Sequence, residues 1–408
     1  MTAAARIREQ QRAASKSAIL DAAVRLYADA GTDGVSLRTV AKSAGLTHPL
    51  VSRYFGSKRG LVAEVGDHVT ACVAAGIEAV DSRDAQGFTE LLQSARRNRP
   101  TTKLLIRCAL GDLSPEGFPD CVGGLWSRSS VRHDRNDVRR ARICQYGASS
   151  LLLGWLTLDE FLVSAVRLDA TSERRRDQTM AATAASVWEL AATPEHALEP
   201  RTTAVRTHST RPSAREERNV RDTLLDSAIE LFAARGPASV SIRDIARHAG
   251  MNHGLLHRHF GTKDDLVAEA IESGVSSLLP GALAADGFDI DDVVHVTHHE
   301  STAPNLIART LVDDIDIRNV RRRYPVMRSL LAALQQLPAD TRPSELADPR
   351  LAAAAVGALV GGSAIWGPSL RHVIGLEDGD GVESAVADLS RHLLGFPNPA
   401  LPPTNQVT

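Results

Sequence analysis

The sequence contains a long internal repeat, and this repeat constrains the fold more strongly than any single motif. Residues 19–64 read ILDAAVRLYADAGTDGVSLRTVAKSAGLTHPLVSRYFGSKRGLVAE, and residues 224–269 read LLDSAIELFAARGPASVSIRDIARHAGMNHGLLHRHFGTKDDLVAE. The two segments align without a gap, and roughly half of their positions are identical, far above chance for such a window. Weaker similarity continues downstream, where KLLIRCALGD from residue 103 resembles NLIARTLVDD from residue 305. The chain is therefore a tandem duplication of about 190 residues per copy.

Each copy has the periodicity of an all-α domain. In the first copy, apolar residues between positions 19 and 27 recur at i, i+3, i+4 and i+7, and the pattern ends at Gly31. Ser36 and Thr47 are predicted to cap two short helices, the second of which runs from residue 48 to residue 55. A long fourth helix is expected to start at residue 57 or 58. Because no segment alternates with a two-residue period over strand length, we expect essentially no β-sheet.

The two short helices of each copy are joined by a tight turn, which is the pattern of a helix-turn-helix. Such a unit lays its second helix in the DNA major groove, where exposed polar, cationic and aromatic side chains can contact bases and phosphates. The next helix begins with unpaired N–H groups and a lysine, which suits a phosphate. The candidate DNA-binding residues are Ser36, Arg38, Thr47, His48, Pro49, Ser52, Arg53, Tyr54 and Lys58 in the first copy, and Ser241, Arg243, Asn252, His253, Gly254, His257, Arg258, His259 and Lys263 in the second.

Basic arms precede both helix-turn-helix segments. They contain Arg6, Arg8, Arg12 and Lys16 in the first copy, and Arg211, Arg215, Arg218 and Arg221 in the second. The competing interpretation of the repeated segments is a helical bundle without DNA affinity. Because the turns, the polar helix and the lysine all occur twice, we favour DNA binding.

Both segments resemble the N-terminal DNA-binding domain of TetR-family transcriptional regulators. The residues that carry the resemblance are V-S-L-R-T-V-A, A-G-L and Y-F-G-S-K-R-G-L in the first copy, and V-S-I-R-D-I-A, A-G-M and H-F-G-T-K-D-D-L in the second. The resemblance implies an all-α fold, a ligand-binding C-terminal domain and a dimer joined by a four-helix bundle. It also implies a repressor that a small molecule releases from double-stranded DNA.

The chain departs from the family pattern in two ways. It carries two TetR-like units, so we expect an intramolecular pseudo-dimer, although further association of two chains stays possible. Ser52 and His257 replace the aromatic residue that commonly precedes the histidine or arginine of the recognition helix, which puts that phosphate contact in doubt.

The repeat also predicts the domain boundaries. Helix-turn-helix domains are expected at residues 1–65 and 217–270, and each is followed by a helical regulatory domain, at residues 66–192 and 271–396. Residues 193–216 are rich in Pro, Thr and Arg without an apolar period, which predicts a linker. Residues 397–408 are predicted to form a disordered tail.

Charge and cysteine content narrow the class of protein. The formal net charge of −2 excludes a protein that coats nucleic acid through bulk positive charge, but it leaves room for a local basic patch. Four cysteines among 408 residues do not make a disulfide framework. The N-terminus lacks the apolar core of a signal peptide. We therefore expect a cytoplasmic, nucleoid-associated protein.

A long apolar segment near the C-terminus has two interpretations. Residues 351–370 carry no charge over the length of a membrane span. However, this segment is rich in Ala and Gly, Pro368 interrupts it, and its counterpart in the first copy contains Asp159 and Glu160. We favour a buried helix–helix interface, and Gly357 and Gly361 would let two helix backbones approach closely. With an amphipathic helix after each apolar segment, the pattern predicts a four-helix bundle between the copies.

The middle helices of each copy carry large apolar side chains that could enclose a pocket for an apolar small-molecule effector. Core packing explains these residues equally well, so the pocket is implied mainly by the resemblance. The candidates are Leu104, Trp126, Tyr146, Trp155, Leu306, Leu330, Leu334 and Trp366.

Other functions have weaker support. The stretch HVTHHE offers His295, His298, His299 and Glu300 at spacings that suit a metal, but the aligned stretch SARR has no ligands. We therefore favour a polar helix end, with no metal and no cofactor. The chain has no Gly-rich phosphate loop, G-x-S-x-G elbow or H-E-x-x-H helix, which argues against an enzyme. The alternative function is a ligand-binding or scaffolding protein in which one or both heads no longer bind DNA.

The two recognition helices are unlike. Their exposed positions share only His48 with His253 and Arg53 with Arg258, which predicts an asymmetric operator with two unlike half-sites. The net charge is about +5 for residues 1–64 and about −1 for residues 215–269. Because phosphate contacts dominate affinity, the first head is predicted to bind DNA more tightly.

Overall fold

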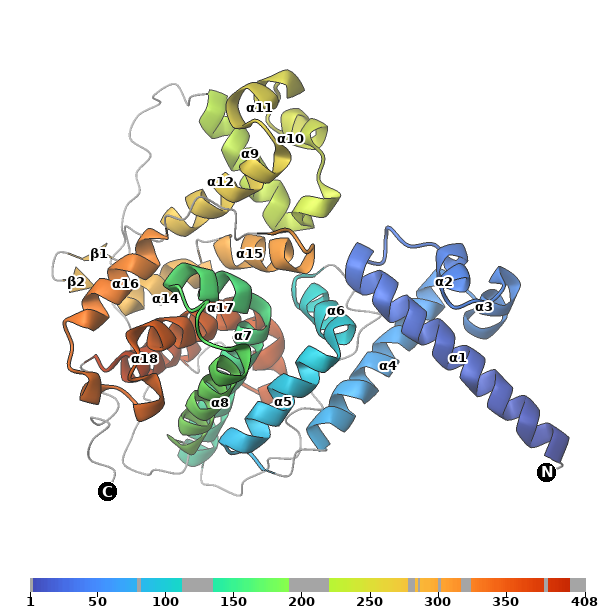
Figure 1. Cartoon of the computed structure of the whole chain (residues 1–408), viewed down its shortest axis with the longest axis horizontal. Coiled ribbons are helices and arrows are strands. Elements are labelled where there is room, and N and C mark those ends of the chain that lie inside the picture. Colours follow the sequence, from blue (N-terminus) through green and yellow to red (C-terminus); the bar gives the residue numbers. More distant parts are fainter. Residues whose placement is uncertain are drawn as a thin grey trace. The chain divides into compact units, whose positions relative to one another are not determined.

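The computed structural model describes residues 3–78, 82–111, 135–190, 220–277, 283–284, 287–299, 302–316, 324–377 and 381–396 (Figure 1). Its contacts divide the chain into two compact units, residues 1–81 with 93–129 and residues 82–92 with 130–408. Across the described ranges the fold is helical apart from one pair of two-residue strands, β1 (Leu283–Ala284) and β2 (Gly287–Phe288). The all-α prediction is confirmed. The predicted linker and tail lie outside the described residues, as do Trp126, Glu300, Arg211, Arg215 and Arg218.

The first unit is built around the first helix-turn-helix. It contains α1 (Ala3–Ala30), α2 (Leu37–Ser43), α3 (His48–Phe55), α4 (Lys58–Glu78), α6 (Arg99–Ala109) and the C-terminal part of α5 (Ala85–Arg97). Tyr27, Val51 and Leu61 are buried in one apolar cluster, which Leu104 of α6 joins. The head therefore shares its core with α6, a helix of the regulatory region that follows it.

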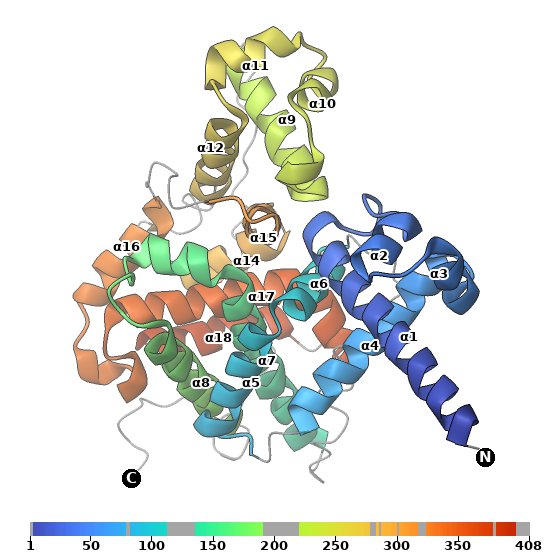
Figure 2. The same cartoon turned by 45° about the vertical axis from the view of Figure 1, so that its right-hand side comes forward.

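The second unit contains the second head, the N-terminal part of α5, the last two regulatory helices of the first copy and the regulatory helices of the second copy. Its elements are α7 (Arg135–Val166), α8 (Glu173–Glu189), α9 (Val220–Arg235), η4 (Pro237–Ser239), α10 (Ile242–His248), α11 (His253–Phe260), α12 (Lys263–Ser276), the strand pair, α14 (Ile290–His299), α15 (Ala303–Val312), α16 (Pro325–Gln335), η6 (Ala339–Thr341), η7 (Ser344–Leu346), α17 (Pro349–Ile374) and α18 (Val382–Leu394). Within this unit, α15 lies between the second head and the bundle that contains α7 and α17 (Figure 2).

The centre of the second unit is a bundle with helices from both copies. The long helix α7 of the first copy packs along α17 of the second, while α8 packs on α7 and α18 packs on α17. The predicted packing of helix pairs from the two copies is therefore confirmed. It buries the apolar segments that the sequence places late in each copy.

Glycines set the closest approach in this bundle. A Cβ atom added at Gly154 of α7 would lie 2.8 Å from the Cα atom of Gly362 in α17, and a Cβ at Gly362 would lie equally close to Gly154. The predicted glycines, Gly357 and Gly361, also face α7, where an added Cβ atom would lie 2.6 Å from Leu162 and 2.5 Å from Leu158. Sequence spacing identified the small-residue face of α17 but not that Gly362 is the glycine that meets the backbone of α7.

Two of the three long apolar helices are largely enclosed by protein. By length and composition alone, three described helices are long enough to cross a membrane, at Lys58–Ile77, Val138–Val166 and Pro349–Ile374. In the last two, 78% and 83% of the most apolar window is buried inside the protein, which supports the interface interpretation. The expectation that Pro368 interrupts this segment is wrong, because α17 continues through Pro368 to Ile374.

Candidate nucleic-acid interface

The first head forms the predicted helix-turn-helix. Ser36 caps α2, because its hydroxyl oxygen accepts a hydrogen bond from the Thr39 amide at 3.1 Å. A glycine with φ +67°, Gly45, makes the turn before α3. Thr47 precedes α3 as predicted, but its side chain makes no capping bond. Pro49, in the first turn, has no N–H to be satisfied, which lessens the need for a cap.

The second head has the same elements with stronger caps. Ser241 and Asp244 form a capping box at α10, with the Asp244 amide 3.1 Å from the Ser241 hydroxyl and the Ser241 amide 3.0 Å from the Asp244 carboxylate. The Ser241 hydroxyl also donates to the Asp244 carboxylate, and this bond, together with the one from the Ser241 amide, holds the pKa of Asp244 below its usual value. Asn252 caps α11 by accepting from the Gly254 amide at 2.9 Å.

The two recognition helices bury one face and expose the other. Val51 and Phe55 of α3, and Leu256 and Phe260 of α11, are buried in their heads. Most candidate DNA-binding side chains lie on the opposite face. The exposed ones are Ser36, Arg38, Thr47, His48, Pro49, Arg53, Ser241, Arg243, Asn252, His253, Gly254, His257 and Arg258, while Ser52, Tyr54, Lys58, His259 and Lys263 are half-buried.

The lysines at the start of the fourth helix of each head have different surroundings. The Lys58 ammonium donates to the carbonyl oxygen of Asp33 at 3.3 Å and remains near the surface. Burial lowers the pKa of Lys263, and the neighbouring carboxylates of Asp313 and Asp264 oppose that shift. The second lysine is thus held among negative charges, which would compete with a phosphate.

Cations of both basic arms have structural partners in their heads. Lys16 pairs with Glu64 at 2.8 Å and lies 5.7 Å from the centre of the Phe55 ring. Arg221, at the equivalent position of the second copy, pairs with Glu269 and lies 5.0 Å from the ring centre of Phe260. These two members of the arms tie the first helix of the head to its fourth helix.

A buried arginine connects each head to the regulatory helix beside it. Arg107 of α6 is 6% exposed, and its Nε atom donates to the Ala28 carbonyl oxygen of α1 at 2.7 Å. Arg309 of α15 is 5% exposed and makes the same bond to Ala233 of α9 at 2.7 Å. The sequence repeat aligns the two arginines, but sequence reasoning did not give them a role. The signal in the sequence was an arginine at the same position of two repeated helices, next to apolar residues.

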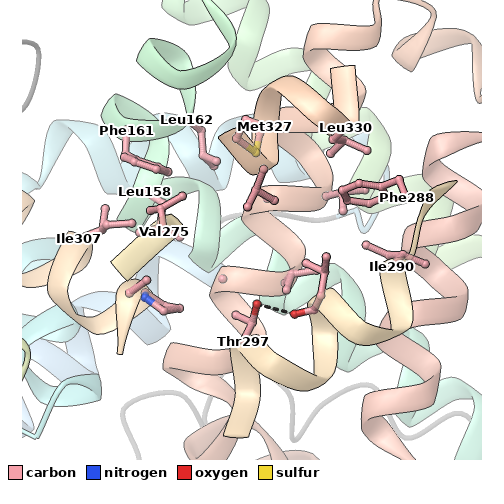
Figure 3. Close-up of a pocket in the computed structure, with 18 residues that line it drawn as sticks. Leu158, Phe161, Leu162, Val275, Phe288, Ile290, Thr297, Ile307, Met327 and Leu330 are labelled. Atoms are coloured by element: carbon pink, nitrogen blue, oxygen red, sulfur yellow. Dashed lines mark hydrogen bonds between the residues drawn. The ribbon is translucent and has the colours of Figure 1, made fainter. Parts of the chain in front are cut away.

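An apolar cavity of about 100 Å³ lies in the second unit (Figure 3). Its walls come from α7 of the first copy and from α12, β2, α14, α15, α16 and α17 of the second. Leu158 and Phe161 contribute from α7, and Met327 and Leu330 from α16. Among the described lining residues Thr297 is polar, and its hydroxyl donates to the Val293 carbonyl oxygen at 2.6 Å. The cavity therefore suits an apolar group.

The structure brings one of the predicted pocket residues, Leu330, to this cavity, and places the other described candidates elsewhere. The indole N–H of Trp155 donates to Asp177 at 2.8 Å, and that of Trp366 donates to Thr157 at 3.1 Å. The Tyr146 hydroxyl donates to the Ser363 carbonyl oxygen at 3.3 Å. The remaining candidates, Leu104, Leu306 and Leu334, are buried in packed helices.

Comparison with known proteins gives a consistent result for both copies. The sequence profile of bacterial regulatory proteins of the tetR family matches residues 19–65 and 224–270. The HTH-type transcriptional repressor Rv3405c of Mycobacterium tuberculosis is 35% identical over 187 residues, which are 45% of this chain and 92% of that protein. The HTH-type transcriptional regulator BetI of Brucella anthropi is 30% identical over 182 residues, 41% of this chain and 88% of that protein. Each relative therefore aligns with less than half of this chain.

Proposed function

Because the chain belongs to the tetR family of bacterial regulatory proteins, we propose that it is a cytoplasmic, nucleoid-associated repressor whose two unlike heads bind an asymmetric operator. The observation that carries the proposal is the pair of exposed recognition helices, α3 and α11, which differ at most outward positions. DNA binding by a transcriptional regulator follows from the family. The asymmetry of the operator, and release by a ligand, are specific to this proposal.

The unlike side chains favour two different half-sites. His48 and Arg53 in α3 have counterparts in His253 and Arg258 of α11, and these shared residues suit phosphates or guanines in both half-sites. The neighbouring positions differ, with Pro49 in one helix and Gly254 in the other. A symmetric homodimer would present identical recognition helices to a palindrome. This chain instead presents two recognition helices with different exposed side chains.

We further propose that an apolar small molecule reduces operator affinity through α15. Ala303, Pro304 and Ile307 of this helix line the cavity, and Arg309 of the same helix holds the second head at Ala233. Asp313, just after α15, accepts a hydrogen bond from the Ala238 amide of η4 at 2.8 Å. A ligand that displaces α15 would therefore move the contacts that orient the second head.

The small volume of the cavity favours a closed, ligand-free arrangement for this structure. Pockets for drug-sized ligands usually measure about 300–1,000 Å³, several times the volume found here. A ligand of that size would need α15 or α16 to move outward. Such binding would shift the population from this closed arrangement toward an expanded one with a differently oriented head.

Selection of bound duplexes from a random pool, with the full chain, tests the operator. We expect a consensus with two unlike half-sites, and a perfect palindrome would contradict the proposal. Repeating the selection with His253→Ala and Arg258→Ala together should erase information from one half-site only.

A salt titration of the binding to the selected DNA distinguishes the alternative function. A specific regulator should lose affinity steeply as salt rises, because phosphate contacts release counterions. Weak binding without sequence preference would instead favour a ligand-binding or scaffolding protein.

A further inference from the structure

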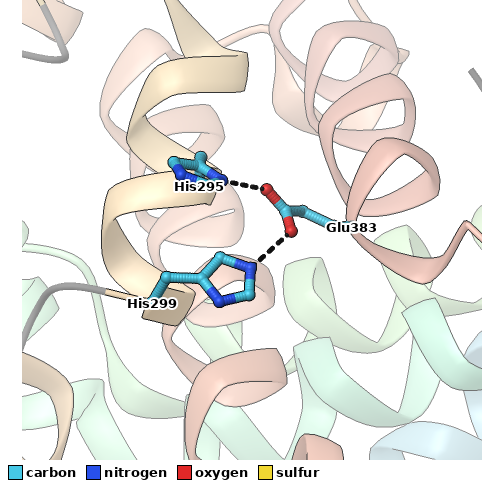
Figure 4. Close-up of side chains that lie close together, drawn as sticks. All are labelled: His295, His299 and Glu383. Atoms are coloured by element: carbon cyan, nitrogen blue, oxygen red, sulfur yellow. Dashed lines mark hydrogen bonds and ion pairs between the residues drawn. The ribbon is translucent and has the colours of Figure 1, made fainter. Parts of the chain in front are cut away.

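Three side chains with metal-binding atoms converge between α14 and α18 in the second unit (Figure 4). His295 and His299 lie one turn apart on α14, and Glu383 lies in the first turn of α18. The Nδ1 atom of His295 is 2.9 Å from one carboxylate oxygen of Glu383, and the Nε2 atom of His299 is 2.8 Å from the other. One donor atom from each residue can be chosen so that all three lie within 4.8 Å of one another.

We propose that His295, His299 and Glu383 form a binding site for one divalent transition-metal ion of the zinc class. Two imidazoles and one carboxylate are a recognised donor set for zinc, and they leave a fourth position for water or another ligand. Zinc holds these atoms at about 2.0–2.2 Å in a tetrahedron, which separates neighbouring donors by roughly 3.3 Å. Small side-chain rotations from the described positions reach that geometry.

Charge and exposure fit a dication. With both imidazoles neutral, the cluster carries the single negative charge of Glu383, which a dication would more than offset. His299 is exposed, while His295 and Glu383 are half-buried, so an ion can enter from solvent to a partly enclosed position. The two imidazoles come from one helix and the carboxylate from another, so the ion would connect α14 to α18.

The neighbouring charged groups are committed to other contacts. Asp291 of α14 pairs with Arg391 of α18, and Arg391 also donates to Asp388 at 3.0 Å. The Asp291–Arg391 pair holds the same two helices together, which supports the spacing of the three ligands. His298 faces elsewhere, with its Nδ1 atom 2.7 Å from the Val294 carbonyl oxygen and its Nε2 atom 2.9 Å from the Ser363 hydroxyl.

The site is predicted to occur once in each chain. The first-copy stretch aligned with HVTHHE is SARR, in which no residue is a metal ligand.

The metal would also have a structural consequence, because Val293 and Thr297 of α14 line the apolar cavity. An ion between α14 and α18 would fasten one wall of that cavity to the bundle.

Titration of the full-length protein with Zn²⁺, in competition with a chromogenic chelator, tests the site. We expect one ion per chain, and an affinity at least about tenfold lower for His295→Gln, His299→Gln and Glu383→Gln. Zn²⁺ should also raise the thermal midpoint of the unaltered protein but not of these variants. As a second measurement, Co²⁺ bound to the unaltered chain should give the intense visible absorption of a four-coordinate site.

The chain provides a matched control. His253 and His257 are exposed side chains of α11 with the same i, i+4 spacing. Among the residues that the structure describes, no third metal ligand lies close to this pair. A double variant, His253→Gln with His257→Gln, should keep the single ion. The proposal is overturned if this control loses the ion, if the three site variants keep full affinity, or if the unaltered chain binds no ion at micromolar Zn²⁺. In that last case the cluster is a carboxylate hydrogen-bonded by two histidines.

Discussion

Arg309 donates from its Nε atom to the carbonyl oxygen of Ala233 at 2.7 Å, and this bond joins the regulatory helix α15 to the first helix of the second head. The equivalent pair in the first copy, Arg107 and Ala28, has the same length. Both acceptors lie in the last turn of their helices, where carbonyl groups lack helical partners and a cation is favourable. The duplicated chain has thus kept the same connection in both halves.

Replacing Arg309 with methionine should lower the free energy of unfolding. The variant keeps much of the buried aliphatic volume but leaves the Ala233 carbonyl oxygen without this donor, which costs about 1–3 kcal/mol. Urea unfolding of the full chain measures the loss. Arg328→Met, at an exposed arginine of α16, is the control and should change stability little. Equal effects of the two substitutions would contradict a specific role for Arg309.

The glycine contact between α7 and α17 predicts a large effect from a single methyl group. Gly362→Ala would place a Cβ atom 2.8 Å from the Cα atom of Gly154, so the two helices would have to separate. We expect a loss at the upper end of the range of about 1–3 kcal/mol that is typical of overpacking. Thermal and urea unfolding report the change.

Gly76→Ala in α4 is the matched control for that substitution. A Cβ atom added there meets only the Ser94 hydroxyl oxygen at 3.6 Å, an ordinary contact. Because alanine favours a helix over glycine by about 1 kcal/mol, this variant should be as stable as the unaltered chain or more so. A destabilised Gly76→Ala with an unaffected Gly362→Ala would show that the packing argument is wrong.

The local pattern predicted the helices well because caps and apolar periodicity act over a few residues. Ser36, Ser241 and Asn252 cap the predicted helices, and the late apolar segments form the bundle. Contacts between distant residues were not predictable in this way. Glu383 lies 88 residues from His295, so the spacing of HVTHHE could not include it.

The pocket prediction shows a second limit. The apolar size of Trp155 and Trp366 suggests a ligand pocket, but each indole N–H needs an acceptor when it is buried. Asp177 and Thr157 provide these acceptors inside the bundle, so both rings pack there and not in the cavity. Size and hydropathy alone do not separate a core residue from a ligand contact.

DNA binding should depend more on the first head than on the second. Alanine at Arg53 and Lys58 should weaken operator binding more than alanine at Arg258 and Lys263, because Lys263 lies beside Asp264 and Asp313. Removal of one phosphate contact also lowers the salt slope by about one unit. Fluorescence anisotropy with labelled operator at several salt concentrations measures both effects. Equal losses for the two pairs would contradict the predicted asymmetry.

Acid should loosen the cap of α10 in the second head. Hydrogen bonds from Ser241 hold the pKa of Asp244 below its usual value, so its ionised form is favoured in the folded state. The stabilisation is therefore full above the unfolded pKa of about 3.9 and is lost as the pH falls through the lower folded-state pKa. Hydrogen exchange of the Ser241 amide, which donates to Asp244, should accelerate relative to the intrinsic rate over that range.

The first head provides the internal control for this acid effect. Thr39 occupies the position of Asp244 and does not titrate, so the Ser36 amide should show no matching change. Asp244→Asn should remove the acid dependence from the second head. An unchanged pH profile in Asp244→Asn would assign the effect to another group.

Substitutions at two leucines of α16 can distinguish an effect on the cavity from an effect on the surrounding core. Leu330 lines the cavity, while Leu334 lies one turn later, is equally well buried and does not line it. Either leucine changed to alanine should cost about 2–5 kcal/mol, because each change removes buried methyl groups. Only Leu330→Ala enlarges the existing cavity, so only this variant should bind bulky apolar compounds more tightly. Calorimetry with a series of alkylbenzenes measures the affinities. If Leu334→Ala gained the same affinity, general loosening of the core would explain the result. If neither gained affinity, this cavity would not be the effector site.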